Sequence, residues 1–301
     1  MEETTASRPV VGVLWMIVTG LLFVGVTAIV KVLGTRIPAP EAAFLRYSMG
    51  LIFLIPMIRP MMRVRLTRRQ WGLFSLRGLV HTGGVTLWFF AMARIPIADV
   101  TAMNYLSPVY VTIGAALFLG EPLALRRIMA VLAALLGALI ILRPGFREVG
   151  PGHLAMLIAA VFFAVSYLVA KRMADETNAI AVVVMLSVMV TIGLAPLAAA
   201  VWVTPTPHEL FLLLLVAALA TAGHYTMSIA FASAPVTVTQ PVSFLQLVWA
   251  VLLGALVFGE GVDVWVLIGG LVIFASVGFI TWREAVLKRR MRTPVASATK
   301  V

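Results

Sequence analysis

The fold of this chain is decided by apolar stretches such as residues 10–33, VVGVLWMIVTGLLFVGVTAIVKVL, in which Lys31 is the single charged residue. A helix needs about 20 such residues to cross the hydrocarbon core of a bilayer. Hydrophobic residues make up 62% of the 301 residues, charged residues only 12%, and the mean hydropathy is +1.06. Soluble domains are roughly a quarter charged. The composition therefore predicts an all-α membrane protein.

Similar stretches recur along the whole sequence, separated by short connections that carry proline, glycine or basic residues. Each is long enough to span a membrane as a helix. We predict ten transmembrane helices, at residues 10–33, 39–58, 70–92, 97–119, 124–143, 152–171, 178–203, 208–231, 236–258 and 263–283.

The distribution of lysine and arginine predicts the orientation of these helices. The formal net charge is +11, but the basic residues lie in short runs between apolar stretches, which argues against a nucleic-acid partner. Sixteen of the 23 lie on the side shared by both termini, and five lie on the other side. Cytoplasmic loops carry the excess of basic residues. We therefore expect a multi-pass protein of the bacterial inner membrane with both termini in the cytoplasm.

The two halves of the sequence repeat each other, a pattern typical of repeated architectures. When the second half is laid over the first in a nearly constant register, the matched pairs include Gly12 and Gly152, Phe23 and Phe163, Lys31 and Lys171, Gly84 and Gly223, Pro96 and Pro235, and Glu121 and Glu260. We predict two five-helix repeats, 1–146 and 147–301, the second ending in a basic cytoplasmic tail. Because five is odd, the second copy enters the membrane from the opposite side. Inverted repeats of this kind are common in secondary transporters, although a duplication can also serve folding alone.

Two Gly-Glu motifs carry a family resemblance. They are Leu119-Gly120-Glu121-Pro122 and Phe258-Gly259-Glu260-Gly261, each at the end of a predicted helix. With the five-plus-five duplication, the chain resembles the drug/metabolite transporter superfamily, EamA type. Within it, the chain is most similar to the aromatic amino-acid exporter (YddG-like) branch. The resemblance implies export of amino acids or similar metabolites through a cavity lined by the first, third, fourth, sixth, eighth and ninth helices.

Polar and aromatic residues at membrane depth are costly, so each is a functional hypothesis. They recur at helical spacing in several predicted helices. The predicted substrate-binding residues are His81, Trp88, Thr101, Asn104, Tyr105, Phe163, Tyr167, His224, Tyr225, Gln240, Ser243 and Gln246. For any single serine or threonine, ordinary packing between membrane helices is the alternative.

The expected cavity has hydrogen-bonding groups and aromatic walls but almost no net charge, which suits a neutral or zwitterionic solute such as an amino acid. Arg46 lies about two turns inside its helix. We expect it to extend to the periplasmic surface, the alternative being contact with a substrate carboxylate. The acidic residues avoid mid-membrane positions, Asp99 being the nearest, so facilitated export is favoured over proton coupling.

We therefore predict a transporter that exports small metabolites, above all amino acids including aromatic ones, by alternating access between the two repeats. Alternatives are proton-coupled export of drugs or nucleotide-type metabolites, an intramembrane enzyme, and a receptor or scaffold. The four histidines lack the His-Glu-x-x-His spacing of metallopeptidases, and the chain has no cysteine. We expect no enzymatic activity, cofactor or metal; the expected partners are a small molecule and the lipid bilayer, with the chain acting as a monomer.

Overall fold

The computed structural model describes residues 9–119, 125–146, 148–174, 176–177, 179–234, 239 and 242–292, and most of these residues are helical. The helices are α1 (Pro9–Leu33), α2 (Ala39–Gly50), the 3₁₀ helix η1 (Leu51–Leu54), α3 (Ile55–Met62), α4 (Arg68–Met92), α5 (Ile97–Asn104), α6 (Leu106–Leu119), α7 (Leu125–Leu142), α8 (Pro151–Ala174), α9 (Ala179–Ala200), α10 (Pro207–Ser233), α12 (Leu245–Phe258) and α13 (Val264–Arg292).

Each of the ten predicted stretches contains helix. The second is divided into α2, η1 and α3, and the fourth into α5 and α6. The break between α5 and α6 falls at Tyr105, because Pro108 has no N–H to bond the carbonyl of Asn104. The first part of the ninth stretch lies outside the described residues, so α12 is its described portion.

Within the described residues, six helical segments are long and apolar enough to cross a membrane by themselves: Val10–Leu33, Ile97–Leu117, Pro151–Ala170, Ala181–Ala200, Pro207–Phe231 and Val264–Arg283. Two apolar helices are shorter, Ile128–Leu142 and Leu245–Phe258. The helix α4 is as long as α1, but arginines, Gln70 and His81 lower its hydropathy. The confirmed result is an all-helical membrane protein, and the count of ten spans stays a prediction.

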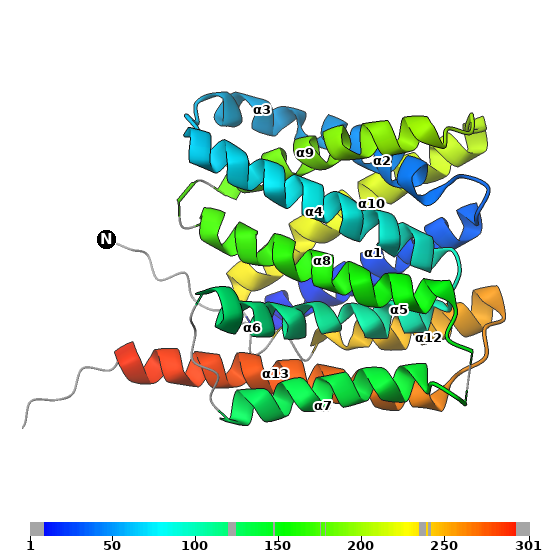
Figure 1. The fold of residues 1–301 in the computed structure, drawn as a ribbon, viewed down its shortest axis with the longest axis vertical. Coiled ribbons are helices and arrows are strands. Elements are labelled where there is room, and N and C mark those ends of the chain that lie inside the picture. The colour runs from blue at the N-terminus through cyan, green and yellow to red at the C-terminus, as the bar shows by residue number, and fades with distance from the viewer. Residues whose placement is uncertain are drawn as a thin grey trace, which may run out of the picture.

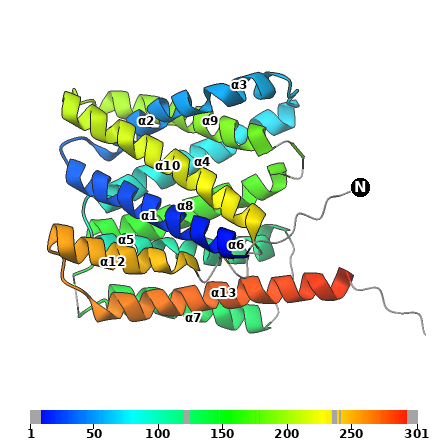
Figure 2. The same cartoon turned by 180° about the vertical axis from the view of Figure 1, so that it is seen from behind.

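Equivalent helices of the two halves run in opposite directions. In Figure 1, α1 and α4 run one way along the bundle, whereas α8 and α10 run the other way. The start of α1 and the end of α13 lie at the same end, as both views show (Figures 1 and 2). The arginine-rich connection between α3 and α4 lies at this end too (Figure 1). The repeat boundary at residue 146 and the membrane orientation stay predictions.

The same helix pairs form in both halves of the bundle when each helix is replaced by its equivalent in the other half. In the longest contacts, α1 packs along α10, α4 along α8, and α7 along α13. The register of the sequence repeat maps α1 onto α8 and α10 onto α4, so the first two contacts are equivalent. In the third, Gly137 and Gly269 face each other so closely that a Cβ on either would lie within 2.7 Å of the other's carbonyl oxygen. Small residues let membrane helices approach in this way.

The helices α4 and α10 also begin with the same local structure. Thr67 accepts a hydrogen bond from Gln70 N at 3.2 Å, and the Gln70 side chain accepts one from Thr67 N. Thr206 and Glu209 make the corresponding pair of bonds at the equivalent positions of the second half. Such capping boxes satisfy otherwise free N–H groups in the first turn of a helix. The two boxes lie at opposite ends of the bundle, where α4 and α10 begin (Figure 1).

A third repeated feature lies inside the bundle. A Cβ added to Gly84 would lie 3.0 Å from the Phe163 ring, and one added to Gly223 would lie 3.3 Å from the Phe23 ring. Phe23 and Phe163 are matched in the sequence repeat, and so are Gly84 and Gly223. In both pairs a phenylalanine from the first helix of one half therefore rests on a glycine of the other half's third helix.

Candidate substrate site

His81 is the centre of a buried hydrogen-bonded chain at the middle of α4. Its Nε2 lies 3.1 Å from the Tyr47 hydroxyl on α2, and its Nδ1 lies 3.1 Å from Ser166 Oγ on α8. The tautomer decides which of these partners donates. His81 and Tyr47 are 7% and 8% exposed, and Ser166 is fully buried. The chain joins three helices and fixes the orientation of the imidazole.

An aromatic wall adjoins this imidazole. The Phe163 ring centre lies 5.1 Å from that of His81, 6.2 Å from that of Trp88 and 6.3 Å from that of Tyr167. Phe163 and Tyr167 are stacked with an interplanar angle of 23°. The Trp88 indole N–H is buried and has no hydrogen-bond partner among the described residues. The wall thus offers flat apolar faces together with a free donor.

Tyr167 and His224 are more open than His81. Tyr167 is 46% exposed, and His224 on α10 is exposed as well. The His224 ring packs edge-on against Phe23, with ring centres 5.2 Å apart. Nearby, the hydroxyls of Thr19 and Thr226 link α1 to α10 over 2.8 Å.

Arg46 differs from the expectation that it extends to the surface. Its guanidinium lies 4.0 Å from the ring centre of Tyr47, whose hydroxyl contacts His81 at the middle of α4. Through this ring Arg46 adjoins the His81 cluster instead of extending to the surface. The overall charge of the expected cavity stays a prediction. The cation–π contact with Tyr47 holds it there.

Other predicted site residues form a separate group around α5, α12 and α13. The Tyr105 hydroxyl donates to the Ser243 carbonyl at 2.9 Å, and its ring lies 6.1 Å from that of Phe274 on α13. Thr101 is buried and donates to the Ile97 carbonyl of its own helix. Asn104 is half-buried at the end of α5. A substrate role for this group stays a prediction.

The remaining three predicted residues take different positions. Gln246 on α12 faces α1, because a Cβ on Gly20 would lie 3.5 Å from the Gln246 Cβ. Tyr225 is 68% exposed and makes no ring or hydrogen-bond contact with the His81 cluster among the described residues. Gln240 lies outside the described residues. The structure thus brings together His81, Trp88, Phe163 and Tyr167.

Sequence reasoning left Tyr47 out of the predicted site and did not foresee that Arg46 points inward. The two residues form an aromatic–cation pair inside an otherwise apolar stretch, which is the signal that could have selected them. Ser166 lies between Phe163 and Tyr167 in sequence, at helical spacing on the same face of α8. The contact of Tyr47 and Ser166 with His81 depends on how three helices pack, so no local pattern predicts it.

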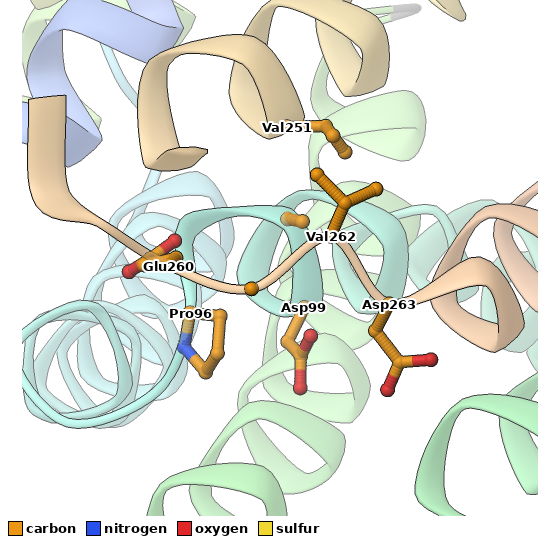
Figure 3. A pocket seen from close by; sticks show the side chains of 8 residues that line it. Pro96, Asp99, Val251, Glu260, Val262 and Asp263 are labelled. Atoms are coloured by element: carbon orange, nitrogen blue, oxygen red, sulfur yellow. The ribbon is translucent and has the colours of Figure 1, made fainter. Parts of the chain in front are cut away.

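A pocket of about 130 Å³ lies near the start of α5, at the end of the bundle opposite the basic one, and is lined by three acidic residues. Figure 3 shows Asp99 and Asp263 pointing the same way, with Glu260 at the start of the connection between α12 and α13. Asp99 Oδ2 lies 2.9 Å from His153 Nε2, Asp263 pairs with Arg143, and Glu260 pairs with Lys31. No metal-binding group occurs in the described part of the chain. The pocket is therefore an ion-paired junction between helices.

Repeated helices of opposite direction, apolar spans and a ring-lined polar cluster inside the bundle define a membrane transporter. The chain belongs to the EamA-like transporter family, whose model matches twice, over residues 10–143 and 150–282. The family membership predicted from the two Gly-Glu motifs is therefore confirmed.

Several characterised relatives match almost from end to end. The riboflavin transporter of Vibrio cholerae is 31% identical, covering 95% of this chain and 97% of the relative. That of Rhizobium johnstonii is also 31% identical, covering 96% and 95%. The S-adenosylmethionine uptake transporter of Rickettsia bellii is 27% identical, covering 84% and 87%. None of these three is named as an amino-acid exporter, so the narrower resemblance stays a prediction.

A solved crystal structure has the same fold. It superposes with a TM-score of 0.59 at 17% identity, covering 94% of this chain and 99% of the other. At this identity the likeness concerns the fold alone.

Proposed function

We propose that this protein is a secondary transporter for a flat, ring-bearing metabolite, with riboflavin as the first substrate to test. The observation that carries the proposal is the aromatic wall of Phe163, Tyr167 and Trp88 beside the hydrogen-bonded imidazole of His81. An isoalloxazine ring has wide apolar faces and a polar edge, so it matches such a wall. Two riboflavin transporters that resemble this chain along nearly its whole length support the choice.

Alternating access is the proposed mechanism. The repeated Phe–Gly contacts, Phe163 on Gly84 and Phe23 on Gly223, support it because they join the two halves through equivalent surfaces. Two arrangements related by exchange of the halves would then have similar energies and open to opposite sides. Described acidic residues within α2, α5 and α10 all lie in the first turn, so we propose gradient-driven movement without a proton-transfer step.

Aromatic amino acids are the second substrate class, with export as the direction. Their rings fit the same wall, and Arg46 offers a partner for the carboxylate. Their ammonium group has no obvious partner at this wall, because the described acidic residues are engaged elsewhere. Because of this missing partner, we rank aromatic amino acids after riboflavin as candidate substrates.

Counterflow in proteoliposomes tests the proposal. Vesicles carrying the purified chain are preloaded with unlabelled riboflavin, and the entry of labelled riboflavin is followed against protein-free vesicles. Labelled phenylalanine and tryptophan are run in parallel. We expect riboflavin counterflow that falls strongly in His81→Phe and persists in Phe211→Leu, a control at an exposed position of α10. Absence of riboflavin counterflow with robust amino-acid counterflow would select the second class, and absence of both would reject the proposal.

A further inference from the structure

We propose that the site beside His81 prefers ring-bearing substrates that also carry an oxyanion, a carboxylate or a phosphate, and that Arg46 is the group that recognises this anion. The inference rests on the proposed function and adds to it a preference for ring-bearing anions over neutral ring compounds such as riboflavin. It concerns a charge inside the bundle that the described protein groups do not neutralise.

The described acidic side chains are committed elsewhere. The ion pairs join Lys31 to Glu260, Arg36 to Glu209, Arg69 and Arg172 to Glu176, Arg143 to Asp263, and His153 to Asp99. Glu41 accepts the backbone N–H of Val203 at 2.8 Å, and Glu148 is exposed in a connection. In the part of the chain that the structure describes, Arg46 and Arg77 therefore have no carboxylate partner.

Arg46 is placed to meet a ligand. It is half-buried, and its described partner is the face of the Tyr47 ring. A cation–π contact uses the flat face of a guanidinium and leaves its N–H edge free. That edge can form two parallel bonds to one carboxylate or phosphate. A bound oxyanion would then lie close to the imidazole of His81, since Tyr47 touches both.

Arg77 adds a second, fixed positive charge one turn from His81 on α4. It is 6% exposed, and one of its terminal nitrogens donates to the Val182 carbonyl at 2.8 Å. Its Nε is buried without a described partner. Because it is held by α9 and nearly inaccessible, Arg77 contributes to the positive potential and not to direct contact.

An anionic substrate is favoured because the surroundings of Arg46 have low polarity. A charge inside a membrane protein is costly unless it is paired, hydrated or functional. An anionic substrate offsets this cost, whereas a neutral one leaves it in place. The same charge attracts anions towards the His81 cluster. The aromatic wall and the cation together favour a molecule that has both a flat ring and an anionic group.

A matched pair of flavins tests the inference. Riboflavin and flavin mononucleotide share the ring and differ by a phosphate, so their competition with labelled riboflavin counterflow isolates the anion. The vesicles contain only zwitterionic phosphatidylcholine, which removes anionic lipid as a competing source of phosphate. We expect flavin mononucleotide to compete roughly tenfold better, as for a charge-assisted bond. Arg46→Gln should remove this preference and Arg46→Lys should keep part of it.

Arg94→Gln is the matched control. Arg94 also covers an aromatic ring, with its guanidinium 3.6 Å from the ring centre of Phe90 in α4, but it is exposed just after the end of this helix. This variant should retain the full preference for the phosphate. Equal competition by the two flavins in the wild-type chain, or an equal loss of both in Arg46→Gln, would overturn the inference while leaving riboflavin transport standing.

A second pair of compounds tests the anion site at Arg46 without relying on flavins. If no flavin competes or moves, 3-phenylpropionate and 3-phenylpropanol are compared as stabilisers of the purified chain in detergent by thermal unfolding. Selective stabilisation by the carboxylate, lost in Arg46→Gln and kept in Arg94→Gln, would support the anion site and reject the flavin proposal. No selectivity in this pair would overturn the inference as well.

Discussion

The carboxylate of Glu260 accepts a hydrogen bond from the backbone N–H of Ile97, with 3.0 Å between the two atoms. The end of α12 therefore caps the start of α5, which belongs to the other half of the chain. Its second oxygen pairs with Lys31 at the end of α1. Gly259 makes this geometry possible, because its φ of 64° ends α12 in the left-handed region and turns Glu260 back over Gly254.

Removing the charge of Glu260 should destabilise the protein. In Glu260→Gln the amide oxygen can still cap Ile97, but Lys31, whose side chain is 20% exposed, loses its ionic partner. We expect a loss of about 1–3 kcal/mol in the free energy of unfolding, measured by thermal unfolding in detergent. Glu148→Gln, in an exposed connection, is the control and should change little. A melting temperature equal to that of the wild type would show that the pair is solvated and unimportant.

The hydrogen bond between Tyr47 and His81 should be measurable by removing one hydroxyl. Tyr47→Phe keeps the ring under Arg46 but leaves His81 Nε2 without its partner. We expect a loss of about 0.5–1.5 kcal/mol in stability and slower riboflavin counterflow, because the imidazole is no longer held. Ser166→Ala should act in the same direction through Nδ1. A double variant whose losses simply add would contradict the linked chain described here.

The repeated Phe–Gly contacts predict a ranked pair of effects. A methyl group at Gly84 would meet Phe163 at 3.0 Å and the Phe162 Cβ at 3.1 Å, whereas at Gly223 it would meet Phe23 at 3.3 Å. Overpacking of this kind costs about 1–3 kcal/mol, so Gly84→Ala should destabilise more than Gly223→Ala. Gly72→Ala, in the first turns of α4 with open space around it, is the control. The reverse ranking in thermal unfolding would show that Phe163 moves aside freely.

The two capping boxes should contribute similar amounts to stability. Thr67→Ala and Thr206→Ala each remove the acceptor for one N–H in the first turn of α4 or α10. A loss of about 1 kcal/mol is expected for each. Thr35→Ala, at an exposed position between α1 and α2, should have almost no effect. Melting temperatures of Thr67→Ala and Thr206→Ala that differ by several degrees would argue against equivalent roles of the two capping boxes.

Much of the fold could be predicted from the amino acids in order. The apolar stretches predicted where helices occur, whereas the break at Tyr105 inside the predicted helix 97–119 became apparent only in the structure. Half of the site was predictable in the same way, because His81, Trp88, Phe163 and Tyr167 are polar or aromatic residues at helical spacing in apolar surroundings. These features depend on near neighbours in sequence, which is why periodicity detects them.

By itself, the sequence determined the class of protein, the repeat and the membrane-spanning character, because hydropathy and self-similarity are properties of the chain alone. Only the tertiary structure decided which side chains meet. It placed Tyr47 and Ser166 on either side of His81, turned Arg46 inward, and separated Tyr105 and Tyr225 from the aromatic wall. The physical reason is that each of these contacts joins different helices, and the rotation and crossing of packed helices are set by all their interfaces together.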